Sequence, residues 1–386
     1  MMCPHTLYLG GNMTNKYYMP TRVIMGDDCI TKNSELFIPL GKKALIVTGT
    51  QSAKRNGSEK DVKTALESVG IQYQVFDKVM SNPTISCVYE GAAFAQANDV
   101  DFIIAIGGGS PMDAGKAIAL LAAQDIEEGS LFSGNYEDKV LPMAFVPTTA
   151  GTGAEVTQYS ILTNDKAQTK TSIASDLLFP TVTFLDAKYT VHLGVITTIN
   201  TAIDALAHAV EGMLSVRASS VSNALAVESI RMIMNCVPVM LQALQSGSED
   251  VINLKQREQL LEASFMAGMV IAQTGTTAVH AMGYSLTYFK DIDHGRANGL
   301  LLGEYLKLVE MVRPDLAGRI LAAMNFSEAE QFRELLSKFL GEKEEISSEE
   351  IDQYSKLAIQ TKNIANCVVK PIEENIRTMF ELSFAK

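Results

Sequence analysis

Four side chains in the second half of the chain have the types and spacing of a metal site. Asp204 and His208 are four residues apart in a helical pattern, so both project from one face. His280 lies in an uncharged stretch, and His294 follows fourteen residues later in a loop-like turn. A single histidine is more often a core or surface residue than a ligand. Together, however, one carboxylate and three imidazoles suit iron or zinc and are poor ligands for magnesium or calcium.

A glycine-rich turn is the first candidate for binding a nucleotide. Gly107, Gly108 and Gly109 follow an apolar, strand-like run and let the backbone approach a ligand closely. Ser110 is predicted to cap the helix that follows, whose free N–H groups and dipole would face a pyrophosphate. The turn is neither GxGxxG nor a Walker loop, and a plain tight turn is the alternative. The cofactor-binding residues predicted here are Gly107, Gly108, Gly109, Ser110, Asp113 and Lys116.

A second candidate loop runs from Pro147 to Val156 after another apolar run. Its hydroxyl and glycine residues offer hydrogen-bond donors with little bulk, although an ordinary threonine-rich loop would look the same. The predicted cofactor contacts are Thr148, Thr149 and Thr152. Doubly wound sheets bind ligands outside the carboxyl ends of their strands, so two such loops at successive strand ends support each other.

The elements that must position these residues change character along the chain. The first half alternates strand-like runs with helical patterns, which predicts a doubly wound, mainly parallel α/β domain. From about residue 199 the apolar spacing is helical over long segments, which predicts an all-α domain. We place the boundary near residue 190, which gives an α/β dinucleotide-binding domain over 1–190 and a helical metal-binding domain over 191–386. The predicted helices of the second half span 223–243, 254–273, 300–312 and 328–339.

Charge and cysteine content exclude several classes of function. A net charge of −12 argues against nucleic acid as a partner, since that affinity depends on clustered Lys and Arg. The five cysteines are scattered without a CxxC pair, which favours reduced thiols, and residues 1–14 lack the pattern of a secretory signal. We therefore expect a cytoplasmic protein.

One stretch, from Ala263 to Phe289, contains no Asp, Glu, Lys or Arg. Its length would permit a membrane span, but small and polar residues interrupt it and would be costly in lipid. We interpret it as buried interior and expect no membrane association. With His280 inside it, the stretch is suited to the wall of a dry active site, and a plain pair of core helices is the alternative.

With these motifs, the chain resembles the iron-containing alcohol dehydrogenases over essentially its whole length. The glycine turn at 107–113 with Lys116 looks like the family's pyrophosphate loop, and 147–153 looks like its second cofactor loop. Asp204, His208, His280 and His294 match the family's metal ligands in type and separation. The resemblance implies a cleft between the two domains, Fe(II) or alternatively Zn(II), and a nicotinamide cofactor. It further implies hydride transfer to or from a small alcohol or aldehyde. We also expect a homodimer or higher homo-oligomer.

Two positions depart from the family pattern. Many members carry another histidine four residues after the ligand at 280, near the nicotinamide and substrate, and this chain has Tyr284 there. Tyr284 can donate a hydrogen bond, but the proton relay of those members is not carried over. Ala202 stands where members usually have glycine. The residues expected at the reacting atoms are His280, Tyr284 and His294.

The segment after residue 48 bears on the choice of cofactor. NAD-specific sites usually place an acidic side chain there, which binds the ribose hydroxyls and repels a 2′-phosphate. This chain has Gly49 instead, with Ser52, Lys54 and Asn56 nearby, and so resembles the NADP-binding members. We expect NADP(H) to be favoured over NAD(H). A surface loop whose basic residues face solvent is the alternative.

Other enzymes share this architecture. A lyase of the dehydroquinate-synthase type would need a cluster of cations for its anionic substrate, and the uncharged wall supplies none. A glycerol-dehydrogenase-like zinc enzyme is the nearest rival among oxidoreductases, and an inactive member kept for binding is a third alternative. The cations nearest the wall in sequence are Lys290 and Arg296, and if both point outward the substrate is neutral. The ordinary hydrogen-bonding side chains of the wall are Gln273, Thr276, Thr277, Tyr284, Ser285 and Thr287.

Overall fold

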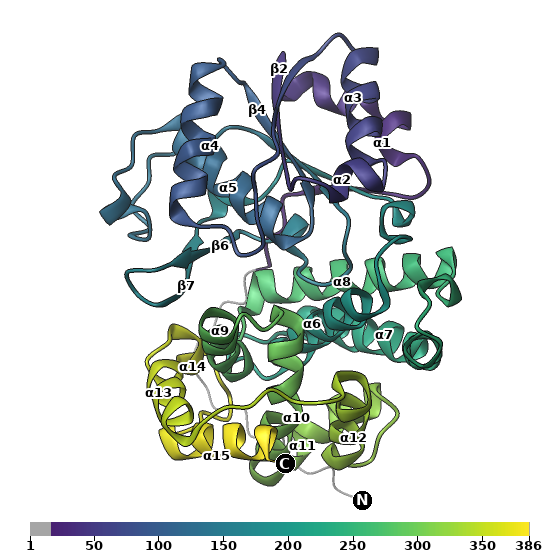
Figure 1. Cartoon of the computed structure of the whole chain (residues 1–386), viewed down its shortest axis with the longest axis vertical. Helices are drawn as coiled ribbons and strands as arrows, with labels where there is room; N and C mark the ends of the chain where they lie inside the picture. The colour runs from purple at the N-terminus through teal and green to yellow at the C-terminus, as the bar shows by residue number, and fades with distance from the viewer. Residues whose placement is uncertain (1–16, 386) are drawn as a thin grey trace, which may run out of the picture.

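The computed structural model describes residues 17–385, which form an α/β lobe stacked on a helical lobe (Figure 1). This confirms the predicted fold class. The domain boundary at residue 190 stays a prediction, although the last strand ends at Leu185 and the first long helix of the second lobe begins at Val195. Predictions that concern residues 1–14, among them Cys3 and His5, lie outside the described residues.

The elements of the α/β lobe are, in chain order, β1 (Arg22–Met25), α1 (Cys29–Lys32), η1 (Ser34–Leu40), β2 (Lys43–Thr48), α2 (Ser52–Arg55), α3 (Ser58–Ser68), β3 (Gln72–Phe76), α4 (Ile85–Ala97), β4 (Phe102–Gly107), α5 (Gly109–Ala123), η2 (Glu128–Ser130), β5 (Met143–Pro147), η3 (Ala154–Val156), β6 (Tyr159–Asn164), β7 (Thr169–Ala174), η4 (Asp176–Leu178), β8 (Val182–Leu185) and η5 (Ala187–Thr190).

A parallel six-stranded sheet forms the centre of this lobe, within the described residues, in the order β1-β8-β5-β4-β2-β3. Successive side chains of a strand point to opposite faces. In β2, Leu45 and Val47 are in a core cluster that also includes residues of α4 and α5, whereas Ala44 and Ile46 are in a cluster with residues of α3. Helices thus cover both faces, as a doubly wound sheet requires.

The strand order reverses between β2 and β4, because β3 lies beyond β2 on one side and β5 lies beyond β4 on the other. Ligands of doubly wound sheets bind in the crevice outside such a point. Gly107 of β4 is in register with Pro147 of β5, and the amide of Thr148 donates to the carbonyl of Gly107 at 2.9 Å. The two predicted cofactor loops are therefore neighbours in space at this crevice.

The antiparallel hairpin of β6 and β7 was not among the predicted elements. It leaves the sheet on the side toward the helical lobe (Figure 1) and contacts α9 there. The hydroxyl of Tyr288 donates to Asp165, at the hairpin tip, over 3.3 Å. The hairpin therefore connects the two lobes along one side of the interface between them.

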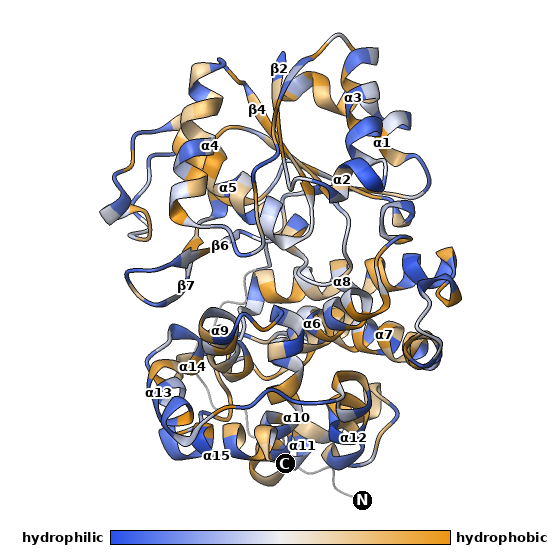
Figure 2. Ribbon diagram, viewed as in Figure 1, coloured by the Kyte–Doolittle hydropathy of each residue, from blue (hydrophilic) through white to orange (hydrophobic). Residues whose placement is uncertain are grey.

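The helical lobe contains α6 (Val195–Met213), α7 (Ser220–Ser246), η6 (Glu249–Val251), α8 (Leu254–Thr274), α9 (Ala278–Lys290), α10 (His294–Val312), α11 (Pro314–Ala323), α12 (Ala329–Leu340), α13 (Ser348–Ile359), α14 (Lys362–Ala365) and α15 (Glu373–Phe384). Figure 2 shows apolar and polar residues alternating around many of these helices, as expected for helices that pack on one face.

Two helix starts differ from the sequence predictions. The helix predicted over 300–312 begins at His294, because the Asp293 side chain accepts the backbone N–H groups of residues 295 and 296. His294 therefore lies in the first turn of α10 and not in a loop. The helix after the glycine turn begins at Gly109 with Gly108 at its N-cap, so Ser110 does not cap it. The Ser110 hydroxyl instead accepts the backbone N–H of Asn82 at 3.2 Å.

The uncharged stretch forms the end of α8 and most of α9, and most of its side chains are buried, as predicted. Within the described residues one helix, α7, is long and apolar enough to cross a membrane, and 39% of its most apolar window is buried. This helix packs against α6 and α8. Taken with this packing, the fold shows no clear character of a membrane protein.

The second cofactor loop touches the helical lobe through two glycines. A β-carbon on Gly268 of α8 would lie 2.7 Å from both Cα and the carbonyl oxygen of Gly153. A β-carbon this close to backbone atoms is a steric clash that no side-chain rotation can relieve. We therefore expect Gly268→Ala to push the second cofactor loop away from α8 and to destabilise the protein by about 1–3 kcal/mol. Thermal unfolding measures this.

Gly318→Ala is the matched control, since Gly318 is a helical residue and a β-carbon added to it would meet no atom within 4 Å. It should stabilise the protein by about 0.5–1 kcal/mol. A Gly268 variant at least as stable as the control would show that the two lobes are not in close contact at this point.

Candidate metal centre and cofactor cleft

The four predicted ligands come together from three helices. Asp204 and His208 lie one turn apart on α6, His280 is in the first turn of α9, and His294 begins α10. The ligand atoms of Asp204, His208 and His280 lie within 4.8 Å of one another. His280 Nε2 is 3.0 Å from His208 Nε2 and 3.8 Å from Asp204 Oδ1, and His294 Nε2 is also 3.8 Å from Asp204 Oδ1. These separations suit ligands that share one metal with bonds of about 2.0–2.2 Å.

The protonation states of these groups also suit a metal. Burial lowers the pKa of His294 to about 3 and lowers the pKa of His208, so both imidazoles are neutral and keep a lone pair. Although burial opposes its ionisation, the neighbouring imidazoles lower the pKa of Asp204 to about 2. The carboxylate is therefore ionised and two of the imidazoles are neutral, whereas the contact with Glu211 outweighs burial and raises the pKa of His280. An ionised carboxylate beside imidazole nitrogens fits a divalent transition metal.

Two buried polar residues contact this set and were not predicted. The carboxylate of Glu211, on α6, contacts Nδ1 of His280. The amide nitrogen of Asn298, on α10, donates to Asp204 Oδ1 at 2.9 Å and lies 3.2 Å from His280 Nε2. Both lie one helical turn from a ligand on their own helix, Glu211 from His208 and Asn298 from His294, and that spacing is the signal that could have identified them.

Tyr284 lies beside the ligands, one turn after His280 on α9. Its ring is stacked on His294 with 6.0 Å between centroids and 12° between planes, and it meets His280 edge-on at 6.4 Å. Burial raises the pKa of Tyr284, so the hydroxyl stays protonated. The residue that replaces the family's further histidine is therefore a neutral hydrogen-bond donor next to the metal ligands.

The two cofactor loops are in contact. A β-carbon on Gly108 would lie 3.0 Å from the Thr149 hydroxyl, and one on Gly109 would lie 2.8 Å from the Thr152 side chain. Glycine at both positions therefore lets the threonine-rich loop cross the start of α5. The two loops therefore lie against each other at the carboxyl ends of β4 and β5.

Lys116 was predicted to bind the cofactor, but its side chain has a structural role. Its side chain is fully buried, and Nζ donates to Ala154 O at 2.7 Å, Thr157 Oγ1 at 3.1 Å and Tyr159 O at 2.8 Å. An ammonium has three donors, and all three are used inside the lobe. Lys116 therefore holds the second loop in place and does not present its charge to a phosphate.

Lys170, on β7, is a cation near the metal ligands that the sequence analysis missed. Its Nζ donates to Asn82 Oδ1 at 2.5 Å, and its charge interacts with Asp204. Burial lowers the pKa of Lys170 to about 8. No recognised motif surrounds this lysine, so it could be found only by placing the hairpin against the cleft.

Gly49 directly follows β2, and the carboxyl end of β2 borders the crevice. Helix α2 begins three residues later, at Ser52. Lys54 pairs with Asp77 over 2.6 Å, and both side chains are about half exposed. The Asn56 side chain accepts the backbone N–H of Ser58 at 3.0 Å. Asp77, which follows β3, is a carboxylate near this segment that the sequence analysis did not consider.

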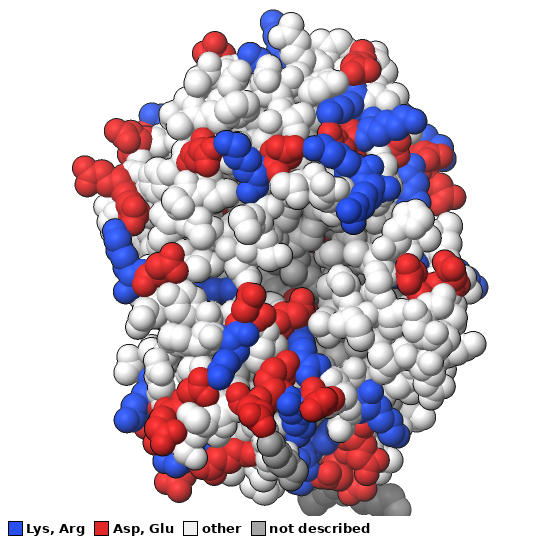
Figure 3. All heavy atoms as spheres, in the orientation of Figure 1, with Lys and Arg blue, Asp and Glu red and all other residues white. Residues whose placement is uncertain are grey.

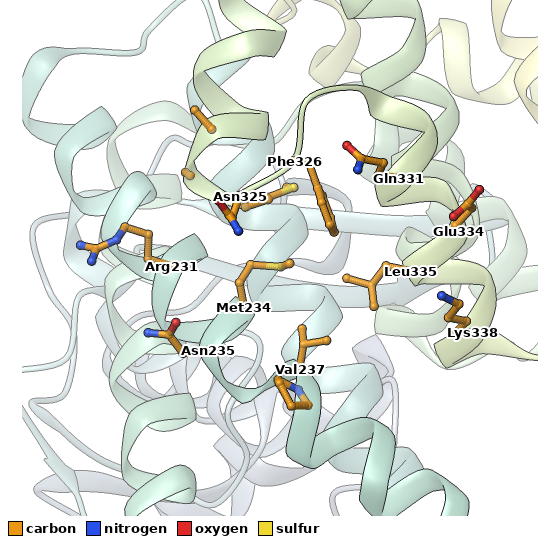
Figure 4. A pocket seen from close by; sticks show the side chains of 14 residues that line it. Arg231, Met234, Asn235, Val237, Asn325, Phe326, Gln331, Glu334, Leu335 and Lys338 are labelled. Atoms are coloured by element: carbon orange, nitrogen blue, oxygen red, sulfur yellow. The ribbon is translucent and has the colours of Figure 1, made fainter.

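A hollow lies between the two lobes, with few charged side chains at its centre and acidic ones along its lower rim (Figure 3). A separate cavity of about 620 Å³ opens in the helical lobe, between α7 and the segment that joins α11 to α12 (Figure 4). It is lined by residues such as Arg231, Phe326 and Lys338 and contains none of the predicted site residues. The interlobe hollow is therefore the candidate active site.

Fold and site together define a class of protein. The carboxyl edge of a doubly wound sheet, where nucleotides bind, lies close to the buried metal ligands, since a β-carbon on Gly151 would be 2.7 Å from the Thr201 side chain on α6, the helix that carries Asp204 and His208. This is the layout of a metal-dependent oxidoreductase that uses a nucleotide cofactor.

Comparison with known proteins gives the family. The family model described as iron-containing alcohol dehydrogenase matches residues 20–187, and its C-terminal counterpart matches 198–384. The chain belongs to the iron-containing alcohol dehydrogenase family and is an oxidoreductase. This confirms the resemblance drawn from the sequence, and the lyase and glycerol-dehydrogenase alternatives are not favoured.

Individual relatives cover most of the chain. It is 35% identical to the 1,3-propanediol dehydrogenase of Citrobacter freundii over 306 residues, and this match covers 78% of this chain and 76% of that protein. It is 30% identical over 367 residues to long-chain-alcohol dehydrogenase 1 of Geobacillus thermodenitrificans, with coverage of 90% and 91%. The solved iron-containing alcohol dehydrogenase of Thermotoga maritima superposes with a TM-score of 0.88 at 36% identity, covering 97% and 100%.

We expect one divalent metal per chain, bound by Asp204, His208, His280 and His294. Replacing His208 or His280 with alanine should abolish both metal retention and turnover, because each removes one of the buried donors. Elemental analysis of protein purified without oxygen, together with an alcohol oxidation assay, measures the two effects.

His192→Ala is the matched control, since His192 lies in the short loop between η5 and α6 and is not one of the four ligands. This variant should retain both metal and activity. Full activity in a metal-free sample of the unmodified protein would contradict the expectation.

Proposed function

We propose that the chain transfers a hydride between NAD(P)(H) and a small primary alcohol or aldehyde, with Fe(II), or alternatively Zn(II), held by Asp204, His208, His280 and His294. The observation that carries this proposal is the buried ligand cluster beside the second of two adjoining cofactor loops. When bound, such a metal supplies a Lewis acid that polarises the oxygen of an alcohol or aldehyde.

We assign the remaining work of the site to the chain's own side chains. The backbone N–H groups of 107–110 bind the pyrophosphate, while Thr148, Thr149 and Thr152 bind nearby parts of the cofactor. Tyr284 donates its hydroxyl hydrogen to the substrate oxygen, a role supported by its place against the ring of His294. The buried wall of α8 and α9 excludes water from the reacting atoms.

We propose a preference for NADP(H), which rests on Gly49 and Lys54. Glycine at 49 places no carboxylate against a 2′-phosphate, and Lys54 brings a positive charge to the same segment. Asp77 partly neutralises that charge through its 2.6 Å ion pair with Lys54. The preference should therefore be set by the balance between position 49 and this pair.

The Gly49→Asp variant should reverse the preference from NADPH to NADH. A β-carbon at 49 would lie 3.3 Å from the Val79 carbonyl oxygen, so that carbonyl must shift by a few tenths of an ångström, and the new carboxylate would repel a 2′-phosphate. Steady-state specificity constants for the two cofactors measure this.

The Asp77→Asn variant is the opposing control and should strengthen the preference for NADPH by freeing Lys54. Equal specificity constants for NADPH and NADH in the unmodified enzyme would refute the proposal.

The substrate we propose is neutral and short, of three to six carbons. Both cations next to the wall are engaged elsewhere: Lys290 pairs with Glu350 at 2.6 Å, and Arg296 pairs with Glu344 at 2.6 Å. An anionic group on the substrate would need a cation in a buried site. Lys170 is the one cation that we have placed near the ligands, and its Nζ is bonded to Asn82.

Butanal should accordingly be reduced more efficiently than succinic semialdehyde, which has the same length and adds a carboxylate. The specificity constants of the two aldehydes test this. A tenfold advantage for the anionic substrate, about 1.4 kcal/mol of transition-state preference, would show that a cation enters the pocket. Loss of such an advantage in Lys170→Met would identify that cation.

We further propose a cytoplasmic homodimer or larger homo-oligomer. Among residues 17–385, the edge strand β1 has no partner on one side, and its Met25 is exposed, so a second copy could pair there. The described cysteines are free, as expected of a cytoplasmic protein. Light scattering would measure the mass of the assembly, and a monomer would contradict this proposal.

A further inference from the structure

We propose that Glu211 is a positioning residue that fixes the tautomer and orientation of His280, so that the Nε2 lone pair of His280 faces the metal. This inference rests on the proposed metal site. It adds a residue that binds neither metal nor substrate directly and acts through one ligand.

The first support is geometric. Glu211 is fully buried on α6, three residues after His208, and its Oε2 contacts Nδ1 of His280. On the other side of the same ring, Nε2 lies 3.0 Å from His208 Nε2 and 3.8 Å from Asp204 Oδ1. The imidazole of His280 therefore stands between the Glu211 carboxylate and the ligand cluster.

The second support is the set of donors around Glu211. Its Oε1 accepts the backbone N–H of Thr277 at 2.8 Å, the Thr277 hydroxyl at 2.7 Å and the backbone N–H of Val279 at 3.1 Å. These donors are at the beginning of α9, where the helix dipole also favours a negative charge. The carboxylate is therefore held as an acceptor on both oxygens.

A fixed acceptor decides the roles of the two ring nitrogens. Because an ionised Oε2 can only accept, Nδ1 of His280 carries a hydrogen, and in the neutral ring that binds a metal the lone pair is then on Nε2. A carboxylate behind a ligating histidine also strengthens that histidine as a donor. Neither His208 nor His294 has a carboxylate contact at its Nδ1 among the described residues.

Glu211 also connects helices, since it lies on α6 and caps the start of α9. It thereby holds His280 against the helix that carries Asp204 and His208. A residue that only caps α9 would affect stability, whereas a positioning residue would also affect metal affinity in the folded protein. The test must separate these two effects.

Glu211→Gln separates them. The glutamine oxygen can still accept from Thr277, but its NH₂ group then faces Nδ1 of His280 and favours the tautomer with hydrogen on Nε2. We expect Zn(II) and Co(II) to bind about 10–100-fold more weakly, as is typical when such a partner is lost. Chelator competition measures the dissociation constants, and thermal unfolding of the metal-free protein measures stability.

Thr277→Val is the matched control. It removes the hydroxyl that donates to Oε1 and leaves the contact between Oε2 and His280, so stability should fall while metal affinity stays close to that of the unmodified protein. Equal metal affinity in folded Glu211→Gln and the unmodified protein would overturn the inference and leave the proposed metal site standing. An unmodified protein that binds neither metal would overturn both.

A measurement on the unmodified protein decides the case even where Glu211→Gln fails to fold. Nitrogen-15 NMR of histidine-labelled, Zn(II)-loaded protein distinguishes protonated from metal-bound ring nitrogens, and the chain has only five histidines to assign. We expect hydrogen on Nδ1 and metal on Nε2 of His280. The reverse assignment, or a His280 that exchanges between tautomers, would overturn the inference.

Discussion

The close approach of α6, α9 and α10 is the constraint on which the metal centre depends. Ligands from three helices can share one ion only if the helices stand at the separation that lets those side chains converge, and here that separation is very short. Two glycines allow this. A β-carbon on Gly295, next to His294, would lie 1.9 Å from the carbonyl oxygen of Asn200 on α6, and one on Gly283 of α9 would lie 2.4 Å from Asn298 Oδ1 on α10. The site thus requires small residues as much as it requires ligands.

The charge balance of the site follows from this packing. Asp204 and Glu211 are both buried, and both have pKa values below the ordinary range for their side chains, so α6 brings two negative charges into the interior. Burying charge is costly unless it is compensated. His208 and His294 are neutral, and His280, whose pKa is raised by Glu211, balances at most one of the two negative charges. A divalent cation at the four ligands would compensate it, which is a physical reason for the metal that does not depend on the family.

The sequence could predict whatever was encoded in short spacings. The pair Asp204 and His208, the glycine turn and the order of strands and helices follow from local patterns, and the structure brings them together as expected. It could not predict contacts made across the chain. Glu211 meets His280 from 69 residues away, and Lys116 is bound to a loop 38 to 43 residues further on. The start of α10 at His294 depends on a cap by Asp293 that was not recognised.

The proposed function requires that Asp204, His208, His280 and His294 share one ion in the cleft between the two lobes. Anomalous X-ray diffraction at the iron absorption edge, on crystals of active protein grown without oxygen, locates that ion. We predict one strong peak per chain at about 2.0–2.2 Å from the three Nε2 atoms and a carboxylate oxygen of Asp204. A peak bound elsewhere, or active crystals without a metal peak at these side chains at any absorption edge, would contradict the shared-ion site.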